Sequence, residues 1–426
     1  MIDLKLLREN PNAIRTAAAA KNVTLDVDRI VELDRKVRSL KGEIEAIAAQ
    51  KNEVSKRIPT ASKEERTAMI EEMRHVDARA EKLAEEFAPL DEELSDLLYK
   101  IPNPPLADVT VGKSDEENSV LREEGTVPTF DFDVKDHATL AEHLGIVDLA
   151  RATKASGARF GYILGDGALL QLALTQYALT VAAKHGFVPV FVPHLVTAQA
   201  MRAMGYLEHG GSDEIYHLAK DNQYLIGTSE QAIGPMHMDE IIALDEPLRY
   251  IGISPCYRRE AGSYGKDTKG FIRMHQFDKV EMFSFCKPEE SAKEHEMILG
   301  IEEELMQGLG LPYHVLNIVS GDLGLPAAKK WDIEAWFPAQ NRYRETHSTS
   351  NCTDFQARRL NTRYRPSTDG GQGGTTAFVH TVNGTAFAIG RTIAAILENF
   401  QHADGSVRIP DVLHPLMGKK ILTQKQ

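Results

Sequence analysis

CYRREAGSYGKDTKGFIRMHQFDKVEMFSF, residues 256–285, decides the fold of this 426-residue chain. Residues 248–260 are rich in β-formers. Residues 271–285 would put Phe277, Lys279, Glu281, Phe283 and Phe285 on one face, because side chains alternate along a strand. Between these two predicted strands, glycines lie among charged residues, which indicates a hairpin loop longer than a tight turn. The stretch therefore predicts two strands joined by the loop 261–270.

Antiparallel pairing of these strands would bring four functional side chains together. Arg258 and Glu260 would share a face and lie beside Phe277 and Glu281. One guanidinium, two carboxylates and an aromatic ring in a small area suit a polyanion that carries a planar base. A solvated surface hairpin is the alternative, and it explains fewer of these residues.

This stretch resembles motif 2 of the class II aminoacyl-tRNA synthetases, in the form found in the seryl-tRNA synthetase family of bacterial type. The resemblance implies an α+β fold: an antiparallel sheet flanked by helices, with an N-terminal antiparallel α-helical coiled-coil arm. It implies a tRNA-binding helical arm over residues 1–105 and a class II catalytic domain over 106–426. The implied activity is that of a serine–tRNA ligase, which uses ATP to form seryl-adenylate, releases AMP and esterifies serine tRNA.

The same resemblance assigns an ATP site to the predicted hairpin. Arg258 would contact the α-phosphate and the amino-acid carboxylate, and Glu260 the adenine side. Phe277 would stack on adenine, and the backbone of Met274 would meet the base; without the motif, Phe277 would be interpreted as a core residue. Arg259 belongs to this ATP-binding run but stands where many relatives have serine, so we expect no direct catalytic role for it.

A second segment, Glu345-Thr346-His347-Ser348, precedes the run NCTDFQARR. A carboxylate and a hydroxyl three residues apart are hard oxygen ligands that suit Mg²⁺. The resemblance implies that all four residues contact ATP, with Glu345 and Ser348 holding Mg²⁺. His347 is expected to pack, because adenylation requires positioning and electrostatic stabilisation rather than an imidazole.

A third segment, TVNGTAFAIGRT at residues 381–392, passes from a predicted strand into a predicted helix. Free N–H groups, the helix dipole and a guanidinium together make an anion site at its start. The segment resembles motif 3, in which Arg391 would meet the γ-phosphate and complete a catalytic set with Arg258 and Glu260. Helix capping is the alternative role for Arg391.

The amino-acid pocket is carried over from the resemblance. The residues implied to bind L-serine are Thr228, Ser229, Glu230, Arg258, Glu281 and Thr385. Relatives often have Thr-Ala-Glu at 228–230 and serine at 385. This chain has Thr-Ser-Glu and threonine there, and it keeps the hydroxyl and carboxylate groups that matter. A pocket that hydrogen-bonds the serine hydroxyl can reject alanine by roughly 10⁴-fold or more, whereas threonine must be excluded by size.

Residues 28–100 carry a heptad pattern with a break at 58–62, which predicts two antiparallel coiled-coil helices. Its apolar positions are Ile30, Leu33, Val37, Leu40, Ile44, Ile47, Val54, Met69, Met73, Val76, Ala80, Leu83, Phe87, Leu90, Leu94 and Leu97. An intermolecular dimerisation coiled coil is the alternative. In the resembled family this hairpin grips the long variable arm of serine tRNA, and a modest excess of Lys and Arg near its tip is compatible with that.

Three further segments organise the rest of the chain. Residues 1–22 read as one amphipathic helix, and residues 106–160 as a connector. The helix expected at 168–185 and the strand at 188–196 together resemble motif 1, which forms the homodimer interface in class II enzymes.

The composition, net charge and cysteine count of the chain argue against several classes of protein. With 42% hydrophobic and 26% charged residues the chain can bury a core, and its net charge of −13 argues against a general nucleic-acid coat. Three scattered cysteines make neither a disulfide framework nor a zinc knuckle. We expect a cytoplasmic protein with no membrane segment, since no apolar run approaches about 18 residues.

Two rival functions remain open from the sequence. A synthetase relative could load an amino acid onto a carrier protein, although such an enzyme has no need of a long arm. A non-catalytic RNA-binding protein on a decayed synthetase fold could also look similar, but its decay should have removed some of Arg258, Glu260, Glu345 and Arg391. Selenocysteine tRNA is a second substrate that the resemblance leaves open. There is no GxxxxGK[ST] phosphate loop and no class I signature.

Overall fold

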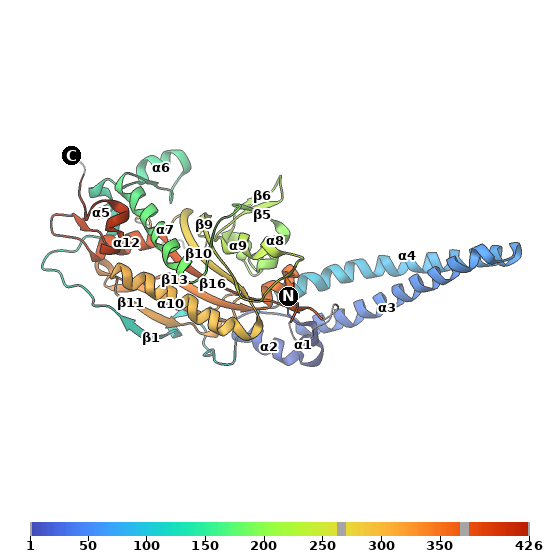
Figure 1. Cartoon of the computed structure of the whole chain (residues 1–426). Coiled ribbons are helices and arrows are strands. Elements are labelled where there is room, and N and C mark those ends of the chain that lie inside the picture. Colours follow the sequence, from blue (N-terminus) through green and yellow to red (C-terminus); the bar gives the residue numbers. More distant parts are fainter. Residues whose placement is uncertain (1, 262–269, 367–374, 425–426) are drawn as a thin grey trace. The chain divides into compact units, whose positions relative to one another are not determined.

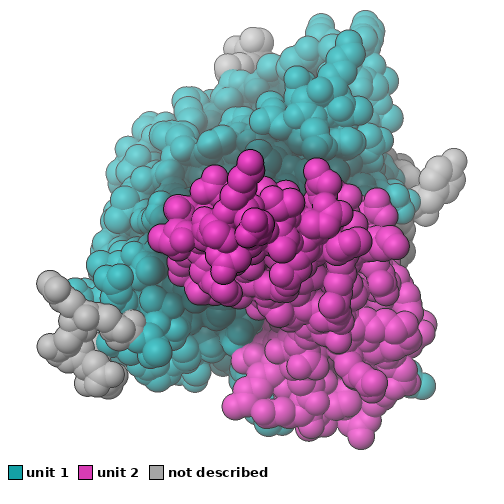
Figure 2. All heavy atoms as spheres, turned by 90° about the vertical axis from the view of Figure 1, so that its right-hand side faces the viewer, with its two compact units in different colours: residues 1, 20–22, 103–426 teal, residues 2–19, 23–102 magenta. Residues whose placement is uncertain are grey.

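The computed structural model describes residues 2–261, 270–366 and 375–424. Most of the loop expected at 261–270 lies outside the described residues. The chain divides into two compact units, drawn in different colours in Figure 2. The helical unit comprises residues 2–19 and 23–102, and the larger unit comprises residues 20–22 and 103–426.

The N-terminus forms two helices, α1 (Leu4–Glu9) and α2 (Pro11–Ala20), rather than the single helix expected there. Proline has no backbone N–H and clashes with the preceding turn, so Pro11 can begin a helix but cannot continue one. Two long helices follow, α3 (Val27–Arg57) and α4 (Lys63–Lys100). A short 3₁₀ turn, Ile58–Thr60, joins them, and Ser62 starts α4 with a capping box.

The heptad prediction for α3 and α4 is confirmed within one chain. The two helices lie side by side and antiparallel (Figure 1). Arg29 pairs with Glu93 near the base at 2.7 Å, and Lys51 pairs with Asp77 nearer the tip. The residues of the α3 seam that are buried are Ile30, Leu33, Val37, Leu40 and Ile47. Because the hairpin covers its own seam, an intermolecular coiled coil is not needed to bury it.

The larger unit is built on one eight-stranded sheet. Its strands, in spatial order, are β1 (Ser119–Glu124), β11 (Tyr313–Asn317), β12 (Lys329–Phe337), β13 (Arg342–Thr353), β16 (His380–Ala388), β10 (Gln276–Cys286), β9 (Leu248–Tyr257) and β4 (Val188–Phe191). All neighbours are antiparallel except β4 and β9, which are parallel. The supposed connector 106–160 thus supplies an edge strand, β1, which pairs with β11.

The strand expected at 188–196 is broken in two. After β4, the chain forms β5 (Leu195–Thr197), which joins a separate sheet with β7 (Gln223–Leu225) and β6 (His217–Leu218). Pro193 lies in the break, where it cannot donate a hydrogen bond to a sheet partner.

Helices cover both faces of the main sheet. One face packs against α7 (Asp166–Lys184), α10 (Ser291–Leu309) and α12 (Ile389–Asn399), with Val280 and Met282 in their core. The other face packs against α8 (Ala198–Met204), α9 (Glu230–Ile233) and α11 (Phe355–Leu360), with Phe283 and Phe285 between them. Successive residues of β10 therefore alternate between two cores, as strand geometry requires.

Smaller elements complete the unit. They are α5 (His137–Leu144), β2 (Val147–Asp148), α6 (Leu149–Ser156), β3 (Tyr162–Ile163), β8 (Ile241–Ile242), β14 (Arg363–Tyr364), β15 (Ala377–Phe378), β17 (Val407–Arg408), α13 (His414–Met417) and β18 (Ile421–Leu422). Within the described residues, no helix is both long enough and apolar enough to cross a membrane.

Candidate active site

The hairpin β9–β10 has the expected antiparallel pairing, with Tyr257 opposite Gln276 and Gly252 opposite Glu281. β10 begins at Gln276 rather than at residue 271 as the sequence suggested. Beyond the last strand pair, the N–H of Arg258 still donates to the carbonyl of His275 at 2.9 Å. The two segments thus stay hydrogen-bonded as far as Arg258.

Arg258 and Phe277 lie together, as predicted. The guanidinium carbon of Arg258 is 5.3 Å from the centre of the Phe277 ring, and its Nε donates to the carbonyl of Gly227 at 3.2 Å. Glu260 has a left-handed backbone, with φ +53°, and accepts a bond of 2.5 Å from Nη1 of Arg273. A positive φ outside glycine is uncommon and often marks functional turns. Arg273 was not among the sequence predictions.

Two other residues of the expected ATP site make contacts of a different kind. Nε of Arg259 donates to the carbonyl of Ile215 at 3.0 Å, and its guanidinium carbon lies 4.8 Å from the centre of the Tyr216 ring. These contacts give Arg259 a structural role. The side chain of Met274 is buried in the core beneath α12, and Met274 and Phe277 both line one cavity.

Glu281 and Thr385 face each other across β10 and β16. The pairing skips Ala386, so that Thr385 lies opposite Glu281 and its hydroxyl donates to Oε2 at 3.3 Å. The same oxygen lies 2.5 Å from Nζ of Lys279, and both charged side chains are almost fully buried. The sequence placed Lys279 on the same face as Glu281 but gave it no role in the site.

Glu230 is the second buried carboxylate of this region. Oε2 accepts from the Tyr206 hydroxyl at 2.8 Å, and Oε1 accepts from Nε2 of Gln356 at 2.8 Å. Burial, together with the nearby charge of Glu281, raises the pKa of Glu230. Neither Tyr206 nor Gln356 was a predicted site residue.

The neighbouring residues Thr228 and Ser229 are buried and differ in their surroundings. The hydroxyl of Thr228 accepts from the N–H of Glu230 at 3.4 Å. Ser229 packs so closely on β9 that a Cβ added to Gly252 would lie 2.5 Å from its Oγ. The backbone of β9 can approach Ser229 only because residue 252 is glycine.

A bulge in β13 brings the two expected metal ligands onto one face. β12 and β13 pair Asp332 with Ser348 and Glu334 with Glu345, and the pairing skips Thr346. In a regular strand, residues three apart point to opposite faces. The extra residue reverses the alternation, so that Glu345 and Ser348 lie on the same face as Asp332.

Glu345 is held by Arg391, the residue expected from motif 3. Nη1 of Arg391 donates to the backbone carbonyl of Glu345 at 2.9 Å and lies 3.3 Å from its Oε2. Partial burial raises the pKa of Glu345, but the neighbouring positive charges, led by Arg391 and Lys330, outweigh this and lower it to about 2. Glu345 is therefore an ionised carboxylate at neutral pH.

The donor set around Ser348 fits Mg²⁺. The Ser348 side chain hydrogen-bonds Asp332, and burial raises the pKa of Asp332 to about 6 although Nζ of Lys330 lies 3.0 Å away. An ionised carboxylate and a hydroxyl on one face match the few hard oxygen ligands that Mg²⁺ takes from proteins. No cluster of three or more His, Cys, Asp or Glu side chains suited to a metal occurs in the described residues.

Thr346 and His347 are turned to other partners. The Thr346 hydroxyl donates to the carbonyl of Ile333 at 3.2 Å. His347 is buried with its ring 5.8 Å from that of Phe387, and burial lowers its pKa to about 4. His347 thus packs under the sheet as a neutral imidazole, in line with the packing role expected from the chemistry, and its contact to ATP stays a prediction.

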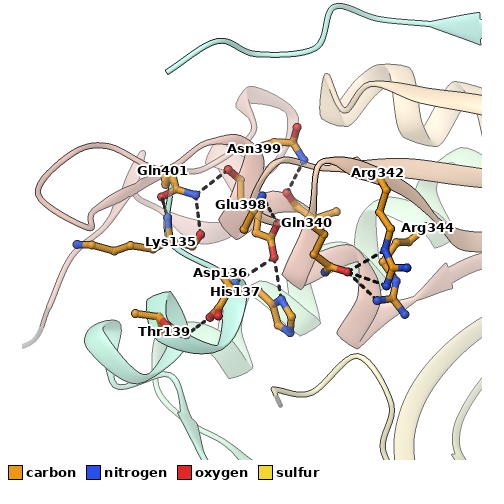
Figure 3. Close-up of polar contacts among 12 residues, drawn as sticks. Lys135, Asp136, His137, Thr139, Gln340, Arg342, Arg344, Glu398, Asn399 and Gln401 are labelled. Atoms are coloured by element: carbon orange, nitrogen blue, oxygen red, sulfur yellow. Dashed lines mark hydrogen bonds and ion pairs between the residues drawn. The ribbon is translucent and has the colours of Figure 1, made fainter. Parts of the chain in front are cut away.

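The helix α12, which carries Arg391 in its first turn, is anchored at its far end (Figure 3). Oε1 of Glu398 accepts from the backbone N–H of His137 at 3.1 Å and lies 2.8 Å from its Nδ1. Its Oε2 accepts from the N–H of Ala339 at 3.0 Å. Gln401 exchanges two bonds of 2.9 Å with the backbone of Lys135. These contacts hold α12, which carries Arg391 in its first turn, against α5.

A further buried carboxyl lies on the opposite face of the sheet. Glu302, on α10, is fully buried, and neither of its carboxyl oxygens has a hydrogen-bond partner among the described residues. It fits because Gly384 has no side chain: a Cβ there would lie 2.6 Å from Oε1 of Glu302. Burial, with the negative charge of Glu281 nearby, raises the pKa of Glu302 well above its ordinary value.

We expect Glu302→Gln to become more stabilising, relative to the native chain, as pH rises. The folded-state pKa of Glu302 is raised above the unfolded value of about 4.3. Its contribution to stability is therefore fully present below that pH and is lost as pH rises towards the folded-state pKa. Melting curves between pH 5 and 9 measure this. Glu296→Gln, at an exposed position of the same helix, is the control, and a constant difference in Tm for Glu302→Gln would contradict the prediction.

Comparison with known families matches both parts of the chain. Residues 1–105 match the family described as Seryl-tRNA synthetase N-terminal domain, and residues 216–400 match tRNA synthetase class II core domain (G, H, P, S and T). A serine–tRNA ligase of Leifsonia xyli subsp. xyli is 46% identical over 420 residues, which cover 98% of each chain.

Two solved structures are similar over the whole length. The seryl-tRNA synthetase of Pyrococcus horikoshii, complexed with ATP, has a TM-score of 0.89 and 38% sequence identity, with all of both chains covered. The cytoplasmic serine–tRNA ligase of Naegleria fowleri, in complex with AMP, has a TM-score of 0.84 and 34% identity, covering 100% of this chain and 99% of the other.

Proposed function

This chain belongs to the seryl-tRNA synthetase family and is a serine–tRNA ligase with the class II synthetase fold, and we propose how its residues divide that work. One observation supports the assignment most strongly. The register of β12, β13, β16, β10 and β9 puts Glu345, Ser348, Thr385, Glu281 and Phe277 on one face of one sheet. Residues 1–105 are then the tRNA-binding arm and residues 106–426 the catalytic domain.

ATP binds, in this proposal, at the motif 2 hairpin and the start of α12. Adenine stacks on Phe277, with Glu260 and the backbone of Met274 at its edge. Arg258 contacts the α-phosphate and Arg391 the γ-phosphate, so positive charge lies at both ends of the triphosphate. Catalysis of adenylation consists mainly of positioning the serine carboxylate in line with the α-phosphate and stabilising the charge that develops there.

Mg²⁺, when bound, neutralises phosphate charge and helps to orient the triphosphate. Glu345 and Ser348 would hold it, because the bulge at Thr346 puts both on one face and Glu345 stays ionised. Arg391, which contacts Glu345, keeps that carboxylate in place.

L-Serine binds, in this proposal, between the carboxylates and Arg258. Glu230 and Glu281 attract its ammonium group, Arg258 its carboxylate, and Thr385 lies beside Glu281 for the hydroxyl. Thr228 contributes through the backbone of Glu230, and Ser229 through packing on β9. Lys279 lies on Glu281 and offsets part of the negative charge of the pocket.

The second half-reaction esterifies the terminal ribose of serine tRNA, which the arm α3–α4 holds by its phosphates. Selenocysteine tRNA as a second substrate stays a prediction. A cytoplasmic location is supported by the three cysteines of the chain, which are buried and free of disulfides.

Pyrophosphate exchange tests the proposed activity directly. We expect ATP–pyrophosphate exchange to depend on L-serine when each of the twenty amino acids is supplied in turn. Aminoacylation should then require serine tRNA. Exchange with a different amino acid, or seryl transfer to a carrier protein instead of tRNA, would overturn the assignment.

A homodimer through the motif 1 segment is the second part of the proposal. Large apolar side chains on α7 and β4 are exposed to solvent, including Phe191 at 83% and Leu172 at 65%. The two elements are in contact, and exposed apolar side chains on adjoining elements are typical of protein–protein interfaces.

Deleting residues 28–100 and joining the ends should therefore leave the dimer intact. Sedimentation velocity of the shortened chain measures this. In the full-length chain, the matched variant Phe191→Asp should dissociate the dimer, because it would bury a charge at the interface. A monomeric shortened chain would instead show that the helical arm carries the dimer contact.

A further inference from the structure

We propose that Tyr206, Gln356 and Thr381 are positioning residues that fix Glu230 as the acceptor for the ammonium group of the amino-acid substrate. This inference rests on the serine-binding role proposed for Glu230. None of the three belongs to the residues that the family resemblance assigned to the site, and they come from three separate parts of the larger unit: the loop after α8, helix α11 and strand β16.

The hydrogen bonds of this network all point towards Glu230. The Thr381 hydroxyl donates to Oε1 of Gln356 at 2.6 Å. The amide of Gln356 is thereby oriented with Nε2 towards Glu230, to which it donates at 2.8 Å. The Tyr206 hydroxyl donates to the other carboxyl oxygen of Glu230 at 2.8 Å. Glu230 thus receives one donor on each oxygen.

Such a network selects both the orientation and the charge of the carboxyl group. Two donors, one on each oxygen, fix the plane of the carboxylate, and each oxygen keeps a lone pair for a ligand. Nε2 of Gln356 can only donate, so a proton on Oε1 of Glu230 would compete with that bond, whereas a proton on Oε2 would require the Tyr206 hydroxyl to accept instead of donate. Donors aimed at a carboxylate favour its ionised form, and they oppose the burial that raises the pKa of Glu230.

The charged surroundings of Glu230 explain why this help is needed. Glu281 and Lys279 face it from β10, and the thiol of Cys352 lies near it on β13. The negative charge of Glu281 opposes ionisation of Glu230, whereas Lys279 favours it. Burial and the proximity of Glu230 raise the pKa of the Tyr206 hydroxyl, so Tyr206 stays a proton donor at neutral pH. A substrate cation bound to Glu230 would be stabilised by an acceptor whose orientation is already fixed.

The decisive variant is Tyr206→Phe, which removes one donor and keeps the ring. We expect KM for serine in pyrophosphate exchange to rise about tenfold, as is typical of one lost bond to a charged group, with KM for ATP and kcat little changed. Loss of the donor should also raise the pKa of Glu230. The acidic limb of kcat/KM for serine should therefore move to higher pH, which a purely structural defect would not cause.

Tyr313→Phe is the matched control. The Tyr313 hydroxyl also donates to a glutamate, Glu303, at 3.1 Å and accepts from Gln307 at 3.0 Å, but Tyr313 lies on β11, towards the other edge of the sheet from the pocket. This variant should keep the KM for serine and its pH profile unchanged. Calorimetric titration of each variant with serine in the absence of ATP supplies a binding readout that does not depend on turnover.

Two further variants test the direction of the hydrogen bonds in this network. Gln356→Met removes the second donor and should weaken serine binding as strongly as Tyr206→Phe. Thr381→Val leaves the donor in place but frees the amide to turn over, so its effect should be smaller. Native-like KM and pH profiles for serine in folded Tyr206→Phe and Gln356→Met would overturn the inference. If the native chain itself shows no serine-dependent exchange, the proposed function fails instead, and the two failures are distinguishable.

Discussion

Replacing residues 40–88 by a short turn should leave serine-dependent pyrophosphate exchange intact while aminoacylation of serine tRNA falls by roughly a hundredfold or more. The residues that we assign to adenylation, from Thr228 to Arg391, all belong to the larger unit. The cut keeps the base of the hairpin, including the Arg29–Glu93 ion pair. Phosphate contacts supply much of the affinity of proteins for nucleic acids and make it dependent on salt, so their loss should affect tRNA binding alone.

The salt dependence of charging gives this experiment an internal check. The shortened protein should show a weaker dependence on salt concentration than the full-length protein, because fewer counterions are released on binding. The full-length variant Arg57→Glu with Lys63→Glu is the matched control, since it keeps the length of the arm and reverses two charges next to its turn. Equal loss of exchange and charging in a folded dimer would mean that the arm supports the active site itself. Full charging by the shortened protein would mean that the arm does not hold the tRNA.

Glu281→Ala should lower kcat/KM for serine in pyrophosphate exchange by roughly a hundredfold, while the protein stays folded. Removing one partner from a buried charge pair costs about 2–5 kcal/mol, and about 1.4 kcal/mol corresponds to a tenfold change. Here the lost partner is the proposed acceptor for serine, and its loss also leaves Lys279 without the carboxylate 2.5 Å away. KM for ATP should change far less than kcat/KM for serine.

A second buried glutamate, Glu302, shows whether a loss of activity comes from lost serine recognition or from altering a buried carboxyl group as such. Glu302→Gln alters a fully buried carboxyl on the other face of the same sheet, where no serine contact is proposed. This variant should keep its exchange activity, and Glu281→Gln should lose most of it, although both changes have the same size. Melting curves exclude unfolding as the cause. Near-native exchange by Glu281→Ala would remove Glu281 from the site.

Much of the fold could be predicted because its patterns are local. The heptad positions from Ile30 to Leu97 predict the helical hairpin, because a period near 3.5 puts apolar side chains on one stripe of a helix. The alternation along β10 predicts that Phe277 and Glu281 share a face, and the register confirms it. The breaks at Pro11 and Pro193 were missed although each proline was visible, since the surrounding residues favoured a continuous helix or strand.

The sequence by itself determined the fold class, the family and the chemical groups of the site, because long motifs such as those at 256–285 and 345–359 fix residue types at fixed spacing. Only the tertiary structure decided which side chains meet. The bulge at Thr346 sets Glu345 and Ser348 on one face, and a bulge depends on how two strands pair. Tyr206 and Gln356 likewise meet Glu230 only through contacts between distant segments. Local periodicity carries no information about such contacts, because they arise when separate elements pack together.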